Sequence, residues 1–159
     1  AMAALYHFYG IRKYPLSHKL FGVFAHRKEF FETPDPLMRG ISDEFHMCHS
    51  RHSTVRESDV RKDPQLKVLA TSHRAGVSVI SNLDHSQVFV LGHMEYDRDT
   101  LKKEYERDLA KGLDIHRPFC YFADQSNDKI NMNWSSTSNL FYNNWLNFVY
   151  QTTPYQFDA

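Results

Sequence analysis

Four stretches of the chain could be helical: residues 1–9, 56–62, 100–111 and 135–150, of which 56–62 is either a charged turn or a helical fragment. The third has the clearest pattern, because Leu101, Tyr105 and Leu109 repeat at every fourth position and so share one face. Asp97, Asp99 and Thr100 at its start could each cap its first turn. Glycines follow the first and third stretches, where a left-handed residue often ends a helix. The first stretch has no capping residue ahead of it.

Five short apolar runs between turn-forming residues predict β-strands: residues 20–24, 45–50, 67–71, 76–81 and 87–92. The last run is an unbroken apolar block, which is typical of a strand buried on both faces of a sheet. Pro15 predicts a loop before the first strand, and residues 113–133 show no regular period. This mixture of helices and strands predicts an α/β fold, but with fewer strands than a complete sheet would have.

Length and composition fit one domain, since 42% of the 159 residues are hydrophobic and can form a core. Lys plus Arg and Asp plus Glu number 19 each, so no net field attracts nucleic acid or an anionic membrane. No run approaches the roughly 18 apolar residues of a membrane span, and no secretory signal opens the chain. The two cysteines are too few for a disulfide framework. We therefore expect a cytoplasmic protein with reduced thiols.

The segment Gly92-His93-Met94-Glu95-Tyr96-Asp97 places an imidazole and a carboxylate two residues apart, after an apolar strand and before a helix. In extended backbone such residues point the same way, so Glu95 could orient the His93 ring and stabilise its protonated form. The alternative is an ordinary solvated strand end. The spacing alone is a weak motif, and it supplies no nucleophile.

Other charged residues allow both a functional and an ordinary interpretation. Glu104 and Arg107 are neighbours on one helix face, where Arg107 could grip a substrate carboxylate or form a surface ion pair with Glu104. Lys19 begins a predicted strand and could reach an acyl oxygen, although most such lysines are solvated.

The segment His46-Met47-Cys48-His49-Ser50-Arg51-His52 gathers three histidines and a cysteine. A strand would turn His46 and His49 to opposite faces, and no second ligand pair stands at zinc-finger spacing, so we expect no metal site. Ser50 could contact a polar substrate. Cys48 could act as a nucleophile if its pKa were lowered, but a buried structural thiol is the commoner role for Cys48 and for Cys120.

These fragments together resemble the homoserine O-acyltransferases of the homoserine O-succinyltransferase type. The resemblance extends from residue 1 to about residue 157 and rests on Tyr9-Gly10-Ile11 with Lys13, Lys19-Leu20 with Gly22-Val23, Arg39-Gly40, His49-Ser50-Arg51, Gly92 to Asp97, Thr100-Leu101, Glu104-Tyr105, Arg107-Asp108, Asn144-Trp145-Leu146-Asn147 and Val149-Tyr150-Gln151 with Thr153-Pro154-Tyr155. Two blocks, Gly92 to Asp97 and Asn144 to Tyr155, together make the resemblance specific.

The resemblance implies an α/β, three-layer, glutamine-amidotransferase-like (flavodoxin-like) sheet, here incomplete at its N-terminal side. It implies acyl transfer from succinyl-CoA or acetyl-CoA to the hydroxyl of homoserine, in methionine biosynthesis, through a cysteine thioester. His93 resembles the catalytic base and Glu95 its orienter. Lys19 and Ser50 match substrate-contacting positions, and Arg107 matches the residue that binds the amino-acid carboxylate. Acyl-CoA would be a co-substrate, with no bound cofactor and no metal.

The same resemblance places the family's nucleophile in a Cys-Trp-Gly-like elbow just before the helix that begins here at Ala1. Neither Cys48 nor Cys120 falls on that position. We therefore expect residues 1–159 to be the C-terminal part of one catalytic domain, inactive alone and a homo-oligomer. The alternative is a non-catalytic half-domain that acts as a binding or assembly module. Neither interpretation predicts nucleic-acid or membrane partners.

Overall fold

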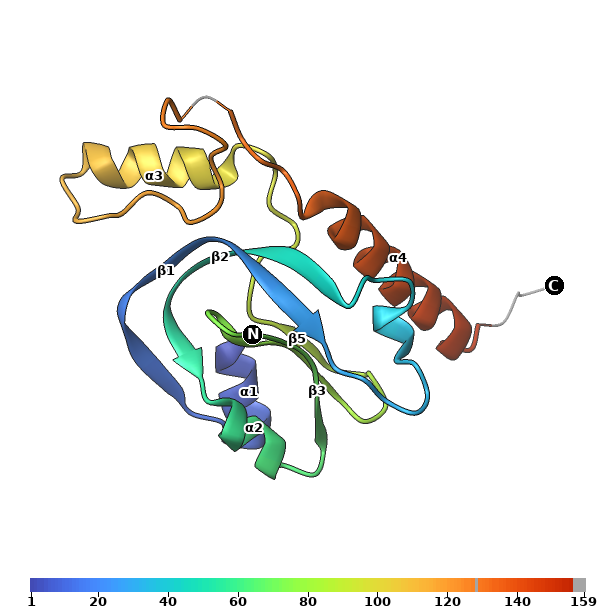
Figure 1. Ribbon diagram of the computed structural model, residues 1–159. Helices are drawn as coiled ribbons and strands as arrows, with labels where there is room; N and C mark the ends of the chain where they lie inside the picture. Colours follow the sequence, from blue (N-terminus) through green and yellow to red (C-terminus); the bar gives the residue numbers. More distant parts are fainter. Residues whose placement is uncertain (128, 156–159) are drawn as a thin grey trace.

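The computed structural model describes residues 1–127 and 129–155 (Figure 1). Along the chain its elements are α1 (Met2–Tyr9), β1 (Lys13–Lys28), the short 3-10 helix η1 (Pro36–Met38), β2 (Glu44–Val55), α2 (Glu57–Lys62), β3 (Leu66–Ser72), β4 (Gly76–Asn82), β5 (Val88–Val90), α3 (Thr100–Ala110) and α4 (Ser135–Thr152). The helices predicted at 1–9, 100–111 and 135–150 and all five predicted strands are present, and segment 56–62 is helical rather than a turn. Strands β1 and β2 are longer than predicted.

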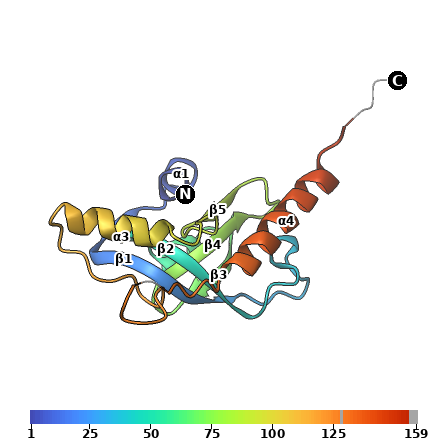
Figure 2. The same cartoon turned by 90° about the horizontal axis from the view of Figure 1, so that it is seen from above.

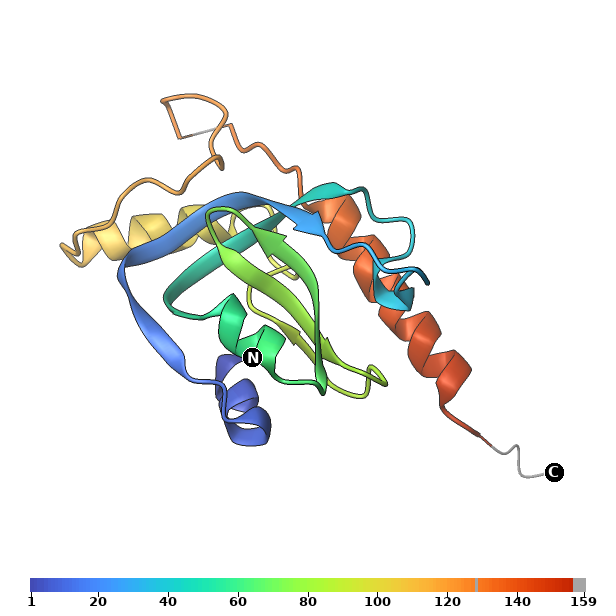
Figure 3. The ribbon, with the colours of Figure 1, turned by 60° about the horizontal axis from the view of Figure 1, so that its bottom comes forward.

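The five strands form one antiparallel sheet in the order β2-β1-β3-β4-β5, which curls into half a barrel (Figures 1 and 3). The predicted loop at Pro15 is wrong, because Pro15 lies in β1 opposite Ser53 of β2. Within the described residues only Arg27 and Lys28 of β1 also pair with β3, so the other side of the strand is unpaired at Pro15. A proline, which has no N–H to donate, is tolerated there.

Helices cover both faces of the sheet, which gives three layers. Figures 1 and 3 show α1 and α2 inside the curl, and Figure 2 shows α3 across β1 and β2 with α4 towards the other end. Leu5 of α1 and Val60 of α2 share a buried cluster with Ile80 of β4. Val79, the next residue towards the start of β4, instead packs with Phe141 of α4. Successive side chains of β4 therefore point to opposite faces of the sheet and pack into two separate cores.

Two details of the predicted elements are wrong. β5 is an edge strand in which only Phe89 is fully buried, whereas Val88 and Val90 are half-buried, so it is not enclosed on both faces. Asp99 precedes α3 without capping it, because its carboxylate pairs with Lys103 at 2.6 Å. The periodic spacing of apolar residues in a helix does not show which polar group a side chain such as Asp99 will pair with.

The irregular segment 113–133 is anchored to β1 at a glycine. Phe119 exchanges backbone hydrogen bonds with Phe21 and Val23, at 2.9 and 2.8 Å. Gly22 lies between those two with φ of 137°, and a Cβ there would lie 2.3 Å from the Phe119 nitrogen. Only glycine therefore allows this segment to lie against β1. Among the described residues no helix is long and apolar enough to cross a bilayer.

Candidate active site around His93 and Glu95

A close backbone contact fixes where His93 lies. After β5 the chain passes over β2, and the His93 amide donates to the Cys48 carbonyl at 2.7 Å. A Cβ on Gly92 would lie 2.8 Å from the same carbonyl oxygen, so the approach requires glycine. The glycine before the histidine therefore sets the position of the imidazole against the sheet.

His93 and Glu95 are brought together as their spacing predicts. The His93 Nδ1 lies 2.7 Å from the Glu95 Oε1, and the His93 side chain is 34% exposed. The Tyr96 ring stacks on the imidazole with centroids 4.2 Å apart. When Nδ1–H donates to the carboxylate, Nε2 carries the lone pair, and within the described chain Nε2 has no hydrogen-bond partner. This atom can accept a proton from a bound hydroxyl.

Glu104 is the centre of a second polar group beside this pair. Ser50 donates to Glu104 Oε2 at 2.6 Å, Tyr96 donates to Oε1 at 2.7 Å, and the Lys19 ammonium lies 3.5 Å away. Burial opposes ionisation of Glu104, but these hydrogen bonds and the Lys19 charge lower its pKa overall. Burial and the bond to Glu104 raise the pKa of Tyr96. These three partners therefore fix the position of the Glu104 carboxylate, and Tyr96 connects it to His93.

Lys19 and Arg107 meet at one carboxylate on α3. Lys19 Nζ lies 3.0 Å from Asp108 Oδ2, and Arg107 Nη2 lies 2.7 Å from Asp108 Oδ1. The hydrogen bonds from Arg107 and Lys19 lower the pKa of Asp108. The Lys19 side chain is only 10% exposed, so the alternative interpretation of Lys19 as a solvated lysine is wrong. The suggested Arg107–Glu104 surface pair is also wrong, because Arg107 pairs with Asp108 and keeps an exposed guanidinium edge.

The sequence did not assign roles to Glu104, Tyr96 and Asp108. The sequence pattern suggests Glu104 only as a partner for Arg107, and the apolar period of α3 gives no reason for the buried Asp108 on the same helix. The signal present in the sequence was the spacing of Glu104 and Asp108, which are four residues apart and therefore stacked on one helix face that Lys19 can reach.

Neither cysteine is placed as a nucleophile for His93. The Cys48 side chain is fully buried in a cluster with Phe21 and Leu101, and burial together with the nearby acids raises the pKa of its thiol. Cys120 is exposed and lines a different cavity with His46. The structure therefore supplies no activated thiol at the imidazole from the residues it describes.

The histidines of β2 are not arranged as a ligand set. His49 is buried and bonded to His26, with Nε2 atoms 3.0 Å apart, and to Arg51. Across the described ranges no three His, Cys, Asp or Glu side chains converge as a metal centre would need.

Comparison with known proteins gives consistent matches. The model of a family described as homoserine O-succinyltransferase matches residues 1–155. The chain is 49% identical over 160 residues to a homoserine O-acetyltransferase of Geobacillus sp. (strain WCH70), covering 99% of this chain and 52% of that protein. It is 50% identical over 158 residues to a homoserine O-acetyltransferase of Methanomethylophilus alvi, covering 98% and 50%. The chain thus spans about half the length of these relatives.

Solved structures share the fold at low sequence identity. A glutamine amidotransferase from Methylobacillus flagellatus superposes with a TM-score of 0.61 at 9% identity, covering 94% of this chain and 59% of that one. A glutamine amidotransferase from Thermotoga maritima superposes with a TM-score of 0.57 at 13% identity, covering 95% and 58%. The predicted glutamine-amidotransferase-like α/β class is confirmed, and this likeness concerns the fold alone.

Proposed function

The chain belongs to the homoserine O-acyltransferase family, and from this premise we propose that it supplies the base and the amino-acid site for acyl transfer from an acyl-CoA to the hydroxyl of homoserine, a step of methionine biosynthesis. The observation that carries the proposal is the His93–Glu95 hydrogen bond, which leaves Nε2 of a half-exposed imidazole open. An imidazole oriented in this way is suited to general-base catalysis near neutral pH.

The neighbouring charges suit an α-amino acid. Its carboxylate needs a cation, and Arg107 presents an exposed guanidinium edge beside Asp108. Its ammonium needs an anion, and Glu104 is a carboxylate with a lowered pKa. Ser50 and Lys19 hold Glu104 in place, so in this proposal they position the ammonium site. These contacts would place a side-chain hydroxyl near His93, because Tyr96 connects Glu104 to the imidazole.

The proposed chemistry has two steps. A cysteine thiolate attacks the thioester carbonyl of acyl-CoA, which transfers the acyl group to the cysteine sulfur and releases CoA as a thiolate that takes up a proton. The homoserine oxygen then attacks this new thioester while His93 Nε2 accepts the hydroxyl proton. The sulfur leaves as a thiolate and the ester is released. Glu95 stabilises the imidazolium formed in the second step.

We propose that the thiol comes from a segment of the full family protein outside these 159 residues, and that the chain alone does not turn over. Two observations support this: the relatives are about twice as long, and Cys48 is buried with a raised pKa. The family model is named for succinyl transfer and the relatives for acetyl transfer, so both acyl donors remain candidates. A homo-oligomer stays a prediction, and light scattering would test it.

The test joins the chain to the preceding half of the Bacillus cereus homoserine O-acetyltransferase, to which it is 51% identical over 157 residues. We expect the fusion, but not the chain alone, to release CoA thiol from acyl-CoA when homoserine is present. His93→Ala in the fusion should lower the rate by at least about 100-fold. His7→Ala, a change at an exposed histidine of α1, is the matched control. Equal rates for the two variants would refute the proposed base.

A further inference from the structure

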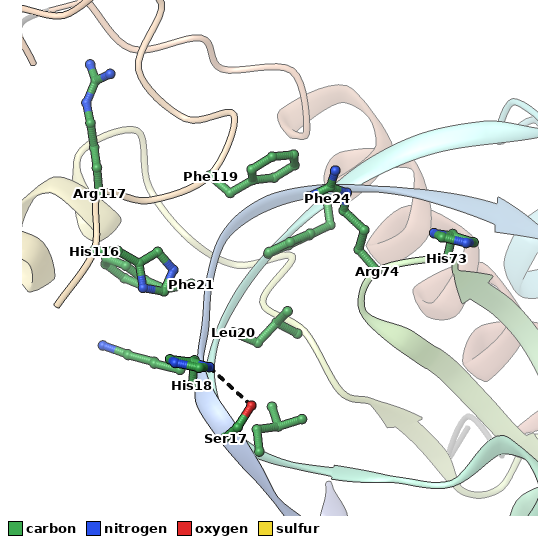
Figure 4. A pocket seen from close by; sticks show the side chains of 12 residues that line it. Ser17, His18, Leu20, Phe21, Phe24, His73, Arg74, His116, Arg117 and Phe119 are labelled. Carbon is green, nitrogen blue, oxygen red and sulfur yellow. Dashed lines mark hydrogen bonds between the residues drawn. The ribbon is translucent and has the colours of Figure 1, made fainter.

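Lys19 also lines a cavity that His93 does not line. It has a volume of about 570 Å³ and is formed by the first half of β1, the turn between β3 and β4, and the segment before Phe119 (Figure 4). Its volume is in the range of small-molecule sites. Lys19 lines this cavity and also contacts Glu104, so the cavity adjoins the proposed amino-acid site.

The wall of this cavity is basic and contains no carboxylate. Arg74 extends from the β3–β4 turn and has no ion pair and no side-chain hydrogen bond within the described part of the chain (Figure 4). Arg117 lines the cavity too, but its three guanidinium nitrogens donate to the Asn127 and Gln125 side chains and to the Asp124 carbonyl, which leaves Arg74 as the arginine available to a ligand. Imidazoles of His18, His73 and His116 complete the polar lining. Guanidinium groups without carboxylate partners are suited to bind phosphate.

An aromatic surface lies beside these guanidinium groups. The Phe24 and Phe119 rings are stacked with centroids 5.2 Å apart, and the Arg74 guanidinium lies 4.6 Å from the Phe119 centroid. A flat heterocyclic base stacks on such rings. A nucleotide fits this combination of rings and guanidinium groups better than a bare phosphate does.

A neighbouring cavity has carboxylates in its wall as well as basic side chains. It has a volume of about 410 Å³, shares Lys19 and His18 with the first, and includes Asp108 and Asp114 in its wall. These carboxylates would repel phosphate. An anionic ligand entering beside Lys19 is therefore favoured on the Arg74 side.

We propose that the Arg74 cavity binds the adenosine 3′,5′-bisphosphate portion of acyl-CoA, with Arg74 on its phosphates and Phe119 against its base. This inference rests on the proposed acyl transfer. Lys19 contacts Glu104, which is bonded to Tyr96 beneath His93, so a CoA bound here would direct its acyl arm along that path towards the imidazole. Arg74 then determines affinity for the donor and takes no part in proton transfer.

The experiment measures binding of adenosine 3′,5′-bisphosphate to the 159-residue chain by calorimetry at low ionic strength, with no acyl group and no homoserine present. We expect saturable binding that Arg74→Gln weakens about tenfold, a typical effect of losing one guanidinium–phosphate contact. Arg27→Gln is the matched control, because Arg27 is an exposed arginine at the far end of β1, and it should change the affinity less than twofold. Arg74→Lys should retain part of the affinity.

Three results would overturn this inference: no saturable binding, equal effects of Arg74→Gln and Arg27→Gln, or inorganic pyrophosphate binding as tightly as the nucleotide. The last result would make the cavity a general anion site. Failure of the acyl-transfer proposal gives a different pattern, in which the nucleotide binds and depends on Arg74 while the fusion protein shows no His93-dependent turnover.

Discussion

Two histidine-centred pairs lie close to one another in this fold and differ in what they can do. His26 of β1 and His49 of β2 are almost completely buried, with Nε2 atoms 3.0 Å apart. His93 follows β5, is half-exposed, and is paired with the carboxylate of Glu95. Burial and the type of partner therefore separate a structural imidazole pair from one suited to proton transfer.

The hydrogen bonds of the buried pair can form with only one placement of the ring protons. The Arg51 Nε–H donates to His49 Nδ1, so His49 carries its proton on Nε2 and donates to His26 Nε2. His26 then donates from Nδ1 to the Phe24 carbonyl at 2.8 Å. Both rings must be neutral for this chain of bonds to exist. Protonating either ring would place a donor against a donor.

The exposed pair has the opposite property. Protonation of His93 at Nε2 breaks no hydrogen bond recorded for the described residues, and the Glu95 carboxylate stabilises the resulting charge. Among the described residues the buried pair has no carboxylate partner, and the nearby basic side chains of His46 and Arg51 oppose protonation of His26.

His49→Ala should have the largest effect on stability. It opens a cavity next to Phe24 and leaves His26 Nε2 and Arg51 Nε without partners, so we expect the free energy of unfolding to fall by about 4 kcal/mol. Urea unfolding followed by circular dichroism measures it. His52→Ala, at an exposed histidine of the same strand, should cost less than about 0.5 kcal/mol. Similar losses in both variants would show that the buried network does not stabilise the fold.

Acid should destabilise the protein through the same pair. Burial lowers the pKa of His26 to about 4, and it lowers that of His49 well below the usual value. Below pH 6.5 the unfolded chain therefore binds protons that the folded chain does not. The free energy of unfolding therefore keeps its full value above pH 6.5 and decreases as the pH falls. The lowered pKa of His26 alone accounts for a decrease of about 3 kcal/mol at pH 4.

A double variant isolates this pH dependence. In His26→Leu combined with His49→Leu both partners are replaced by apolar side chains, while Arg51 keeps its bonds to the Ser53 and Ala75 carbonyls. Unfolding titrations from pH 7 to pH 4 should then show a much smaller slope than the wild-type chain. An unchanged slope would assign the acid sensitivity to other groups.

Gly92→Ala disturbs both pairs through one backbone contact. Its Cβ would lie 2.8 Å from the Cys48 carbonyl oxygen and 2.9 Å from His49 Cε1, so the strand end must move away from β2. We expect a loss of about 2 kcal/mol in the free energy of unfolding. Gly112→Ala adds a Cβ that meets nothing within 4 Å, and its left-handed φ of 68° should cost about 1 kcal/mol. A smaller loss for Gly92→Ala than for Gly112→Ala would contradict the steric argument.

Local signals in the sequence predicted the elements well and their lengths less well. Gly10 ends α1 with φ of 68°, as its position predicts. β1 extends from Lys13 to Lys28 instead of over five residues, because pairing of residues 13–15 with β2 holds its polar start without burial. Apolar patterning detects burial, so it cannot detect a solvated strand such as the one around Pro15.

The site shows the same division between local and long-range information. His93 and Glu95 are two residues apart, so backbone geometry alone predicts their pairing. The Ser50–Glu104 bond spans 54 residues and the Lys19–Asp108 bond spans 89. No periodicity connects such positions, and their association depends on how β1, β2 and α3 pack.

His93→Gln should have the smallest effect on stability, less than about 0.5 kcal/mol, because the ring is half-exposed and the amide can still donate to Glu95. In the fusion protein the same substitution should abolish turnover, since a side-chain amide cannot accept the hydroxyl proton. Urea unfolding and CoA release on the same preparations measure both effects. A loss of stability comparable to that of His49→Ala would mean that His93 is also a structural imidazole. That result would remove the difference between the two pairs on which its role as a base depends.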